Sequence, residues 1–555
     1  MGRQNQLPYL LVAALAVPGL SMAAYGLWGG PTTPEAAAPA PSTSTTPSTT
    51  PSGPTMPQGG GMVTPGEVDL VRAAPVATDA PSSEALCPGC DVVVITICSL
   101  RRDHVSAYGE VDSLTPNIDR IAAEGVRFDR AYSASNFTLA SLTAILTGRF
   151  GSSTGVLGWD KGLVDDVPTL SSVLGLYGYH TGAFTIDAAS GFRPDYGLDR
   201  GFQTMRVISP PPDTPDGRRE NATVGPGGAS AAPVAEWIRA ADPDVPLFTM
   251  FHSRTAHYPF VINDDGVEED ATGVTRALWL AGRERTADGP MPGSAGGTAQ
   301  KGVVQIAKDP VQEAVRAAGA EGVEVWKRLY ADAVARMDQD VGVVLKALED
   351  SGRLDRTVVL LVADHGESLD DHGELLHGDA YFDGVVRVPL VMRIPGVEGG
   401  QTVAALVSQV DIAPTLLRLV GAMPPAGIDG RSAVPLLTGE LDAIRGTALV
   451  EGGVAMRDHP TARGAVISPP WVMIRQDRGC SNRPRPAFGE PQTCLFSLDD
   501  TDQLKDLAQE QDAIVTELSE RWSAYVGAQA EAGEALELDP DFVEMLQQSG
   551  YDFRP

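Results

Sequence analysis

The chain has 555 residues, 43% of them hydrophobic, so it can bury a large core and is too long for one ordinary domain. Its formal net charge of -30 argues against a nucleic-acid partner, because phosphate contacts need clusters of Lys and Arg. The simplest explanation of this acidity is a well-solvated, soluble surface.

The first predicted element is an apolar stretch from Leu7 to Trp28, which follows Arg3. As a helix it would span about 33 Å, close to the thickness of a bilayer core. Ser21-Met-Ala23 resembles a signal-peptidase site, so residues 1–29 are either a cleaved signal peptide or a retained transmembrane anchor, and the length favours the anchor. In both cases we expect an exported protein, periplasmic or at the cell surface, with a membrane link through this segment.

Residues 30–87 are rich in Pro, Ser and Thr and cannot bury a core, so we expect a disordered or extended linker. Four of the five cysteines form two pairs that are close in sequence, Cys87 with Cys90 and Cys480 with Cys494. In an exported protein each pair could form a disulfide, which leaves Cys98 over. The Cys87-Pro-Gly-Cys90 motif is also compatible with a redox pair, although it precedes the first strand.

Strands and helices alternate from residue 91 onward. Val92–Ile97 is a continuous β-branched run, typical of a strand buried on both faces. Thr115 and Pro116 predict an N-cap and a first helical residue, with the helix ending near Glu124. Further strands are expected at 126–132, 179–185, 247–251, 357–363 and 389–394, and further helices at 139–147, 168–176, 232–241 and 323–350.

This alternation predicts an α/β fold for residues 88–440, with a mostly parallel central sheet flanked by helices. Residues 262–320 are Gly-rich and predict an irregular surface insertion. The pattern changes near residue 440, where strand-like segments at 447–450, 471–474 and 494–498 precede a helix at about 511–526. Residues 441–555 are therefore expected to form a small C-terminal α+β subdomain, an antiparallel sheet with a packed helix.

Polar residues collect at the ends of two predicted strands. Cys98 to His104 follow the first strand, and Asp364-His365-Gly366-Glu367 follow a later one. A carboxylate and an imidazole at the carboxyl edge of a parallel sheet suit a divalent metal. Five of the eight histidines lie in two windows of the chain: His252, His257, His365, His372 and His377. Such clustering favours a functional site, although we expect His372 in a surface loop.

Eight segments follow one another in a familiar order: 92–104, 115–132, 138–148, 362–367, 377–378, 387–393, 410–417 and 429–432. Together they resemble the sulfatases, a branch of the alkaline-phosphatase superfamily, over about residues 91–437. It implies an alkaline-phosphatase-like fold and a divalent cation, often calcium, that holds the nucleophile and one oxygen of a sulfate or phosphate group.

Position by position, the resemblance implies a set of site residues. Asp364 and His365 match metal ligands, and Cys98 falls where the family has a metal-binding aspartate. His257 and His377 match positions that contact the substrate. We therefore expect metal ligation by Asp364, His365 and Cys98, with calcium as the first expectation and zinc or manganese as alternatives, because a thiolate suits a softer ion.

Thr138 falls where sulfatases carry the cysteine or serine that is converted to formylglycine. Threonine cannot be converted in that way, so no formylglycine is expected. Thr138 is either a nucleophile or a plain N-cap, and Cys98 is either a ligand or a buried small residue. The family's residues after the nucleophile are replaced by Ala140 and Leu142, which lack their polar groups.

Three functions follow from these observations. The leading one is a metal-assisted hydrolase of sulfate or phosphate esters outside the cytoplasm, with a sulfated or phosphorylated small molecule or glycan as substrate. The second is a phosphoryl-group transferase that uses Thr138. The third is a catalytically inactive binding or scaffold protein, suggested by the changes at Cys98, Ala140 and Leu142. The sequence leaves open whether the chain is an enzyme.

Overall fold

The computed structural model of the chain describes these residues: 85–109, 114–159, 161–186, 196–208, 230–258, 273–275, 310–377, 380–452, 463–476, 479–480, 491–527 and 534–535. The predicted segment 1–29 and nearly all of the linker at 30–87 lie outside them. Among the helices in the described ranges, none is both long and apolar enough to cross a membrane.

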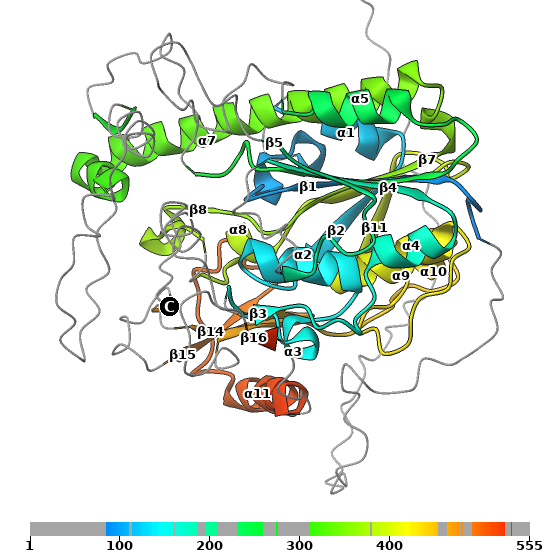
Figure 1. The fold of residues 1–555 in the computed structure, drawn as a ribbon. Coiled ribbons are helices and arrows are strands. Elements are labelled where there is room, and N and C mark those ends of the chain that lie inside the picture. The colour runs from blue at the N-terminus through cyan, green and yellow to red at the C-terminus, as the bar shows by residue number, and fades with distance from the viewer. Residues whose placement is uncertain are drawn as a thin grey trace, which may run out of the picture. The chain divides into compact units, whose positions relative to one another are not determined.

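The predicted mostly parallel sheet is confirmed (Figure 1). It has eight strands in the order β11-β2-β10-β7-β1-β6-β4-β5, and within it only β10 runs antiparallel to its neighbours. The strand bounds are β1 Asp91–Ile97, β2 Val126–Tyr132, β4 His180–Ile186, β5 Thr204–Ile208, β6 Leu247–Ser253, β7 Thr357–Ala363, β10 Leu390–Arg393 and β11 Gln401–Ser408.

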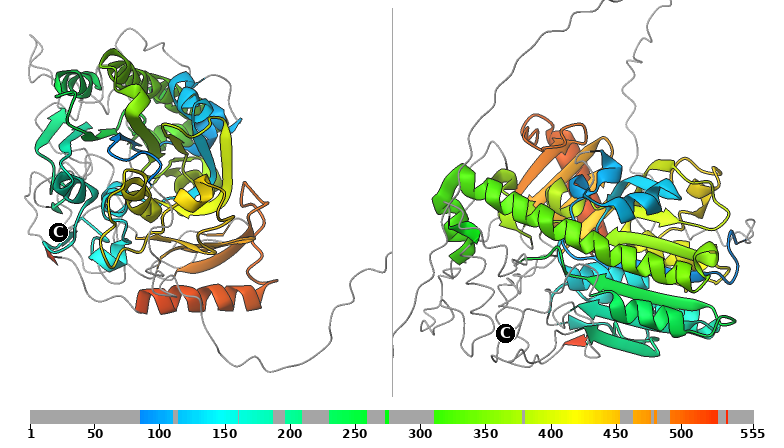
Figure 2. Two further views of the ribbon diagram at one scale, coloured as in Figure 1. Left: turned by 90° about the vertical axis from the view of Figure 1, so that its right-hand side faces the viewer. Right: turned by 90° about the horizontal axis from the view of Figure 1, so that it is seen from above.

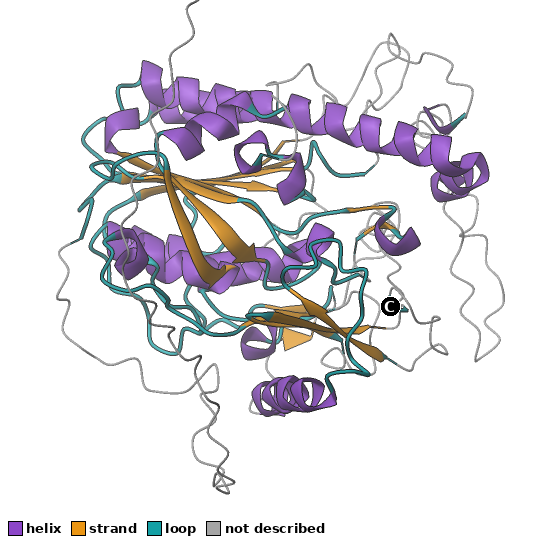
Figure 3. Ribbon diagram, turned by 180° about the vertical axis from the view of Figure 1, so that it is seen from behind, coloured by secondary structure: helices purple, strands orange, loops and turns teal. Residues whose placement is uncertain are grey.

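Helices cover both faces of this sheet (Figures 1 and 3). One face carries α1 Pro116–Ala123, α5 Ala232–Ala240 and α7 Pro310–Asp350. The other carries α2 Thr138–Thr147, α4 Leu170–Leu176, α9 Ile412–Leu419 and α10 Val434–Leu437. The shorter elements are α3 Gly151–Thr154, α8 Asp383–Val386, β3 Lys161–Gly162, β8 Ser368–Leu369, β9 Leu375–Leu376 and β16 Glu534–Ala535.

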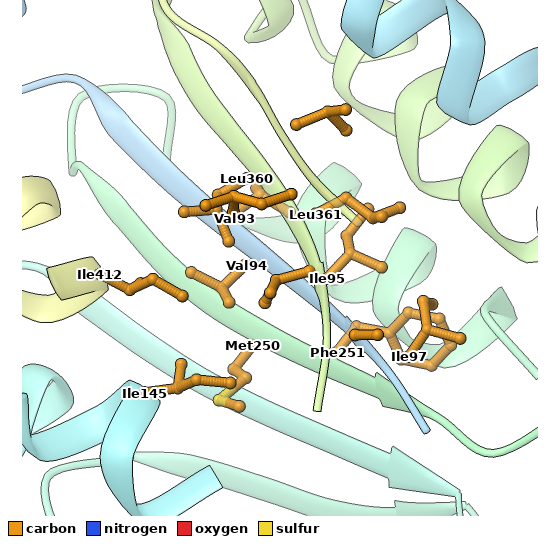
Figure 4. Close-up of a cluster of buried hydrophobic side chains, with 14 of the residues drawn as sticks. Val93, Val94, Ile95, Ile97, Ile145, Met250, Phe251, Leu360, Leu361 and Ile412 are labelled. Carbon is orange, nitrogen blue, oxygen red and sulfur yellow. The ribbon is translucent and has the colours of Figure 1, made fainter. Parts of the chain in front are cut away.

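The core surrounds β1, which is buried at every residue and pairs in parallel with β6 and β7. Its β-branched run therefore reflects burial on both faces, as the sequence predicts. Side chains from β6, β7, α2 and α9 pack against it (Figure 4). The labelled members are Val93, Val94, Ile95, Ile97, Ile145, Met250, Phe251, Leu360, Leu361 and Ile412.

Two expectations about the central domain need correction. Residues 310–320 belong to helix α7, not to an irregular insertion, and a break at Gly319 with φ 64° separates them from the rest of the helix. Val315 is fully buried, which explains why this part folds onto the core. Strand β11 was not expected, because its first half is largely exposed and its short apolar run contains two alanines in place of β-branched residues.

The expected small antiparallel sheet with a helix is also present. It comprises β12 Ala448–Glu451, β13 Gly464–Ser468, β14 Trp471–Gln476 and β15 Gln492–Ser497, in that order. Helix α11, Asp512–Gly527, lies along this sheet (Figure 2, left). Its Leu518 and Trp522 belong to a buried cluster with side chains of the sheet. Strand β13 was missed by the sequence analysis. The domain boundary near residue 440 stays a prediction.

Both cysteine pairs form disulfides, Cys87 with Cys90 and Cys480 with Cys494, as one interpretation of the sequence predicts. Cys98 is the remaining free thiol and is buried. The backbone N–H of Cys87 donates to the carbonyl of Leu419, 2.9 Å away, so the first pair is joined to helix α9. Disulfides of this kind persist mainly in oxidising compartments.

A buried ion pair links the amino end of β1 to the turn after α7. Arg353 Nη1 lies 2.9 Å from Asp91 Oδ2, and their side chains are 2% and 1% exposed. We expect Arg353→Ala to cost about 3 kcal/mol, the lower end for a broken buried pair, because Arg356 Nε lies 3.4 Å from the same oxygen and keeps part of the compensation. The midpoint of urea unfolding measures this. Arg239→Ala, which breaks an exposed pair with Asp350, should cost less than about 1 kcal/mol, and equal losses would contradict the prediction.

A buried carboxyl group joins the small sheet to α3. Glu451 Oε2 accepts from the backbone N–H of Ser152 at 2.8 Å, and Ser152 Oγ lies 2.5 Å from Oε1 and 3.0 Å from the Tyr525 hydroxyl. Burial raises the pKa of Glu451 to about 7. The folded state therefore holds this proton more tightly than the unfolded state, so the contribution of Glu451 to stability is greatest below about pH 4.5 and is lost as pH rises through about 7.

Glu451→Gln should remove this loss, because a neutral amide carries no buried charge at any pH. We expect the free energy of unfolding of this variant, measured by thermal melts, to match that of wild type at pH 5. At pH 8 it should exceed that of wild type by up to about 3 kcal/mol. Glu520→Gln, on the exposed side of α11, is the control and should follow wild type at both pH values. A wild-type-like decline in Glu451→Gln would show that this carboxyl group is not the cause.

Candidate active site

Three adjacent parallel strands end at one place. In the register of the sheet, Ile97 of β1 pairs with Ala363 of β7 and with Ser253 of β6. Cys98 and Asp364 therefore emerge side by side, and His252 of β6 reaches the same point. Each of these three residues offers one ligand atom, all within 4.8 Å of one another and all buried.

Asp364 is held by the backbone of the neighbouring loop. Its Oδ1 accepts from the N–H groups of Ser99 at 3.1 Å and His365 at 2.6 Å. Ser99 has a φ of 61°, and its carbonyl accepts from the Tyr330 hydroxyl of α7 at 2.6 Å, which stabilises this strained conformation. Although burial opposes ionisation, His365, His252 and the two N–H groups lower the pKa of Asp364.

Thr138 begins helix α2 and faces this cluster. Its Oγ1 lies 3.4 Å from Cys98 Sγ and 3.3 Å from His365 Nε2. His365 Nδ1 lies 2.8 Å from the Gly366 carbonyl, so Nδ1 carries the ring proton and Nε2 can accept one from the Thr138 hydroxyl. Burial lowers the pKa of His365 to about 4, which keeps the ring neutral at pH 7.

Three imidazoles line the site in succession. The ring centroids of His365 and His377 are 4.2 Å apart, and those of His377 and His257 are 5.0 Å apart. His377 Nδ1 lies 3.0 Å from Glu367 Oε1. Burial lowers the pKa of His377 to about 4, lowers that of His257, and raises that of Glu367 to about 8. These rings can donate or accept protons beside a bound substrate.

A buried cation completes the arrangement. Arg254, 3% exposed, follows β6 directly, and its Nη2 lies 3.2 Å from ring nitrogens of His257. Its positive charge acts to lower the pKa of both Cys98 and His377, so it lies near the strand-end cluster and near the row of histidines. A guanidinium at this position can bind the oxygens of an anionic group.

The six site residues predicted from the sequence lie in one continuous set of contacts. Those residues are Thr138, His257, His377, Asp364, His365 and Cys98. The metal role of His365 stays a prediction, since its Nε2 lies 3.6 Å from Asp364 Oδ2 and also faces Thr138. The donor atom that His252 offers in this cluster and the guanidinium of Arg254 were not among the predicted site residues. Their position at the end of the strand beside β1 is the signal that could have found them.

The other polar residues near the end of β1 have structural contacts. Arg101 pairs with Asp103 at 2.5 Å and also with Asp371 at 2.5 Å. Arg101 Nη1 further donates to the Glu367 carbonyl at 2.8 Å. His372 stacks on Phe382 with ring centroids 3.6 Å apart. These contacts hold the loop that carries Glu367.

The residues at the strand ends fit a divalent cation. Asp364 Oδ2 is fully buried and has no hydrogen-bond partner among the described residues, an arrangement that is costly unless a cation lies beside it. Cys98 and His252 supply two further donor atoms within reach of the same ion. A bound cation would supply positive charge next to Thr138 and to a substrate oxygen.

Comparisons with known proteins agree on one family. A sulfatase family model matches residues 91–422. Steryl-sulfatase of Rattus norvegicus is 28% identical over 423 residues, 64% of this chain and 71% of that protein. N-acetylglucosamine-6-O-sulfatase of Bacteroides thetaiotaomicron is 25% identical over 398 residues, 60% and 68% respectively. The solved phosphonate monoester hydrolase of Agrobacterium radiobacter shares the fold, with a TM-score of 0.57 at 21% identity over 81% of this chain and 98% of that one.

Proposed function

The chain belongs to the sulfatase family, since the family model covers more than half of it, and from this premise we propose that it hydrolyses sulfate esters with Thr138 as the nucleophile. The contacts of Thr138 carry the proposal. Its hydroxyl lies beside the unprotonated nitrogen of His365 and beside the cluster of Cys98, His252 and Asp364. A nucleophile within hydrogen-bond reach of an oriented base is the arrangement that covalent catalysis requires.

The proposed reaction has two steps. Thr138 Oγ1 attacks the sulfur of the ester, its proton passes to His365 Nε2, and the bond from sulfur to the alcohol oxygen breaks. Water then attacks the sulfated threonine, which releases sulfate and returns the hydroxyl. The N-terminus of α2, a helix of ten residues, directs its free N–H groups towards the same anionic group.

The remaining side chains are assigned by charge and position. Arg254 binds sulfate oxygens, because its guanidinium lies buried beside His257. His257 or His377 delivers a proton to the departing alcohol oxygen. Since burial lowers the pKa of both rings, the donor must gain its proton when the anionic substrate binds. In this assignment Arg254 takes over the role of the polar residues that the family carries at the positions of Ala140 and Leu142.

The substrate class follows from the relatives. Two of them are named for a steryl sulfate and for N-acetylglucosamine 6-O-sulfate, so we propose a sulfated small molecule or glycan for this chain. The two disulfides support an exported protein outside the cytoplasm, either periplasmic or at the cell surface. A membrane link through residues 1–29 belongs to the same proposal.

A phosphorus ester is the second candidate, because the phosphonate monoester hydrolase shares the fold and a threonine hydroxyl can also accept a phosphoryl group. The test is a panel of aryl sulfate, aryl phosphate and aryl phosphonate monoesters, each assayed with the metal-loaded protein. We expect the sulfate to react with the highest kcat/KM. A faster phosphate or phosphonate favours the second candidate. No turnover of any ester favours a non-catalytic binding protein.

A further inference from the structure

We infer that the cluster of Cys98, His252 and Asp364 is a zinc site rather than a calcium site, with His252 as its imidazole ligand. The inference rests on the proposed function for the site's role, because both concern the same strand ends. It adds the identity of the metal and a ligand that the family resemblance did not indicate.

The donor atoms decide between the two ions. Calcium takes six to eight oxygen ligands, whereas this cluster offers one sulfur, one nitrogen and one carboxylate. Zinc binds thiolate, imidazole and carboxylate in tetrahedral sites, and a catalytic zinc has three protein ligands and one open position. A thiolate and a carboxylate together carry two negative charges, which neutralise a divalent ion in this buried place.

The separations of the donors also suit a small tetrahedral ion. At zinc-to-ligand distances of 2.0–2.3 Å, neighbouring ligand atoms lie about 3.5 Å apart. The three donor atoms here lie within 4.8 Å of one another. Small side-chain rotations would bring the donor atoms from these separations to those of a tetrahedral zinc site. The six to eight oxygens around a calcium ion would instead have to come from residues outside this cluster. Thr138 Oγ1, 3.4 Å from Cys98 Sγ, adjoins the cluster at the side where the substrate is proposed to bind.

The neighbouring groups prepare two of the ligands. Thr96 pairs with His252 across the strands, and its Oγ1 lies 3.0 Å from His252 Nδ1 and 3.4 Å from the Phe251 carbonyl. When the hydroxyl donates to that carbonyl it accepts from Nδ1–H, which leaves Nε2 as the metal-binding nitrogen. Asp364 is oriented likewise: backbone N–H groups occupy Oδ1 and leave Oδ2 to the ion.

The competing explanation is that Cys98 is an inert buried thiol. The absorption spectrum of the cobalt(II)-loaded protein distinguishes a metal-bound thiolate from an inert thiol. Cobalt(II) occupies zinc sites, and a thiolate bound to it gives an intense near-ultraviolet charge-transfer band. The assignment of that band is unambiguous here. The chain has five cysteines, four of them are in disulfides, and Cys98 is the remaining thiol.

The experiment uses the full chain, stripped with a chelator and titrated with cobalt(II). We expect the thiolate band to saturate at one cobalt per chain, zinc to displace it at one equivalent, and calcium to leave it unchanged. Elemental analysis of protein refilled from a mixture of zinc and calcium should find one zinc. Absence of the band, or one bound calcium in place of zinc, would overturn the inference.

Variants test each ligand. Cys98→Ser should abolish the band, and His252→Gln should weaken zinc binding at least about 100-fold, since even outer contacts of metal ligands change affinity 10–100-fold. The matched control is His180→Gln, on strand β4, where the ring packs on Trp237 with centroids 4.8 Å apart. It should bind cobalt as wild type does. If His252→Gln binds equally well, the ligand assignment is wrong.

Failure of this inference differs from failure of the proposed function. A saturable thiolate band without turnover of any ester would contradict the hydrolase and leave the zinc site intact. Ester hydrolysis supported by calcium, without the band, would contradict the zinc site and leave the hydrolase intact. Thermal melts of Cys98→Ser and His252→Gln without metal show whether each variant folds, and the titration of the unaltered chain does not depend on them.

Discussion

Thr138→Ala is expected to reduce the kcat for ester hydrolysis by at least about 1,000-fold. The substitution removes the hydroxyl that lies 3.3 Å from His365 Nε2 and 3.4 Å from Cys98 Sγ, and so removes the atom that would attack sulfur. Thr138→Ser keeps a hydroxyl and should stay within about tenfold of wild type if the nucleophile assignment is right. Steady-state rates with the metal-loaded protein measure both.

Thr143→Ala is the matched control for this experiment. Thr143 lies on the same helix and is equally buried, but its Oγ1 donates to the Leu139 carbonyl at 2.7 Å. Its loss should cost about 1 kcal/mol of stability and leave kcat unchanged. Mass spectrometry of acid-quenched wild type should find a sulfuryl group on Thr138 and none in Thr138→Ala. Full activity in Thr138→Ala would mean that water attacks the ester directly.

Most of the central fold could be predicted from the sequence, because the strands buried on both faces carry continuous β-branched runs. Val92–Ile97 is such a run, and residues 357–363 carry Val and Leu in a continuous apolar run; both strands lie in the middle of the sheet. Strand β11 lies at an edge, where half of its residues face solvent and no such run is required. Residues 310–320 were missed because they follow a Gly-rich segment and include Gly319, where the helix is broken.

The site was predicted where a residue directly follows a strand or matches a family motif. Cys98 and Asp364 meet both conditions, and the parallel register brings them together. His252 directly follows the predicted strand at 247–251 but matches no family motif, and the pairing of Thr96 with His252 is what places it at the cluster. Such pairing depends on which strands become neighbours, and this order is not encoded in any local segment.

Asp364→Asn is expected to weaken metal binding at least about 100-fold and to reduce turnover accordingly at limiting metal. Asparagine keeps the shape of the side chain and can still accept from the N–H groups of Ser99 and His365. It loses the negative oxygen that has no hydrogen-bond partner among the described residues. The effect therefore tests the ligand role without a change of volume. Asp355→Asn, at a side chain that is 99% exposed, is the control and should behave as wild type.

Stability gives a second test of the same role, because the loss should grow when metal is added. Without metal, Asp364→Asn should melt a little below wild type, since the surroundings lower the pKa of this carboxyl group and so favour its ionised form, while the amide oxygen keeps the bonds to the N–H groups. With saturating metal, wild type gains binding energy that the variant lacks, and the difference in melting temperature should widen. A purely structural carboxylate would make the variant less stable by the same amount under both conditions, since the loss would not depend on an ion.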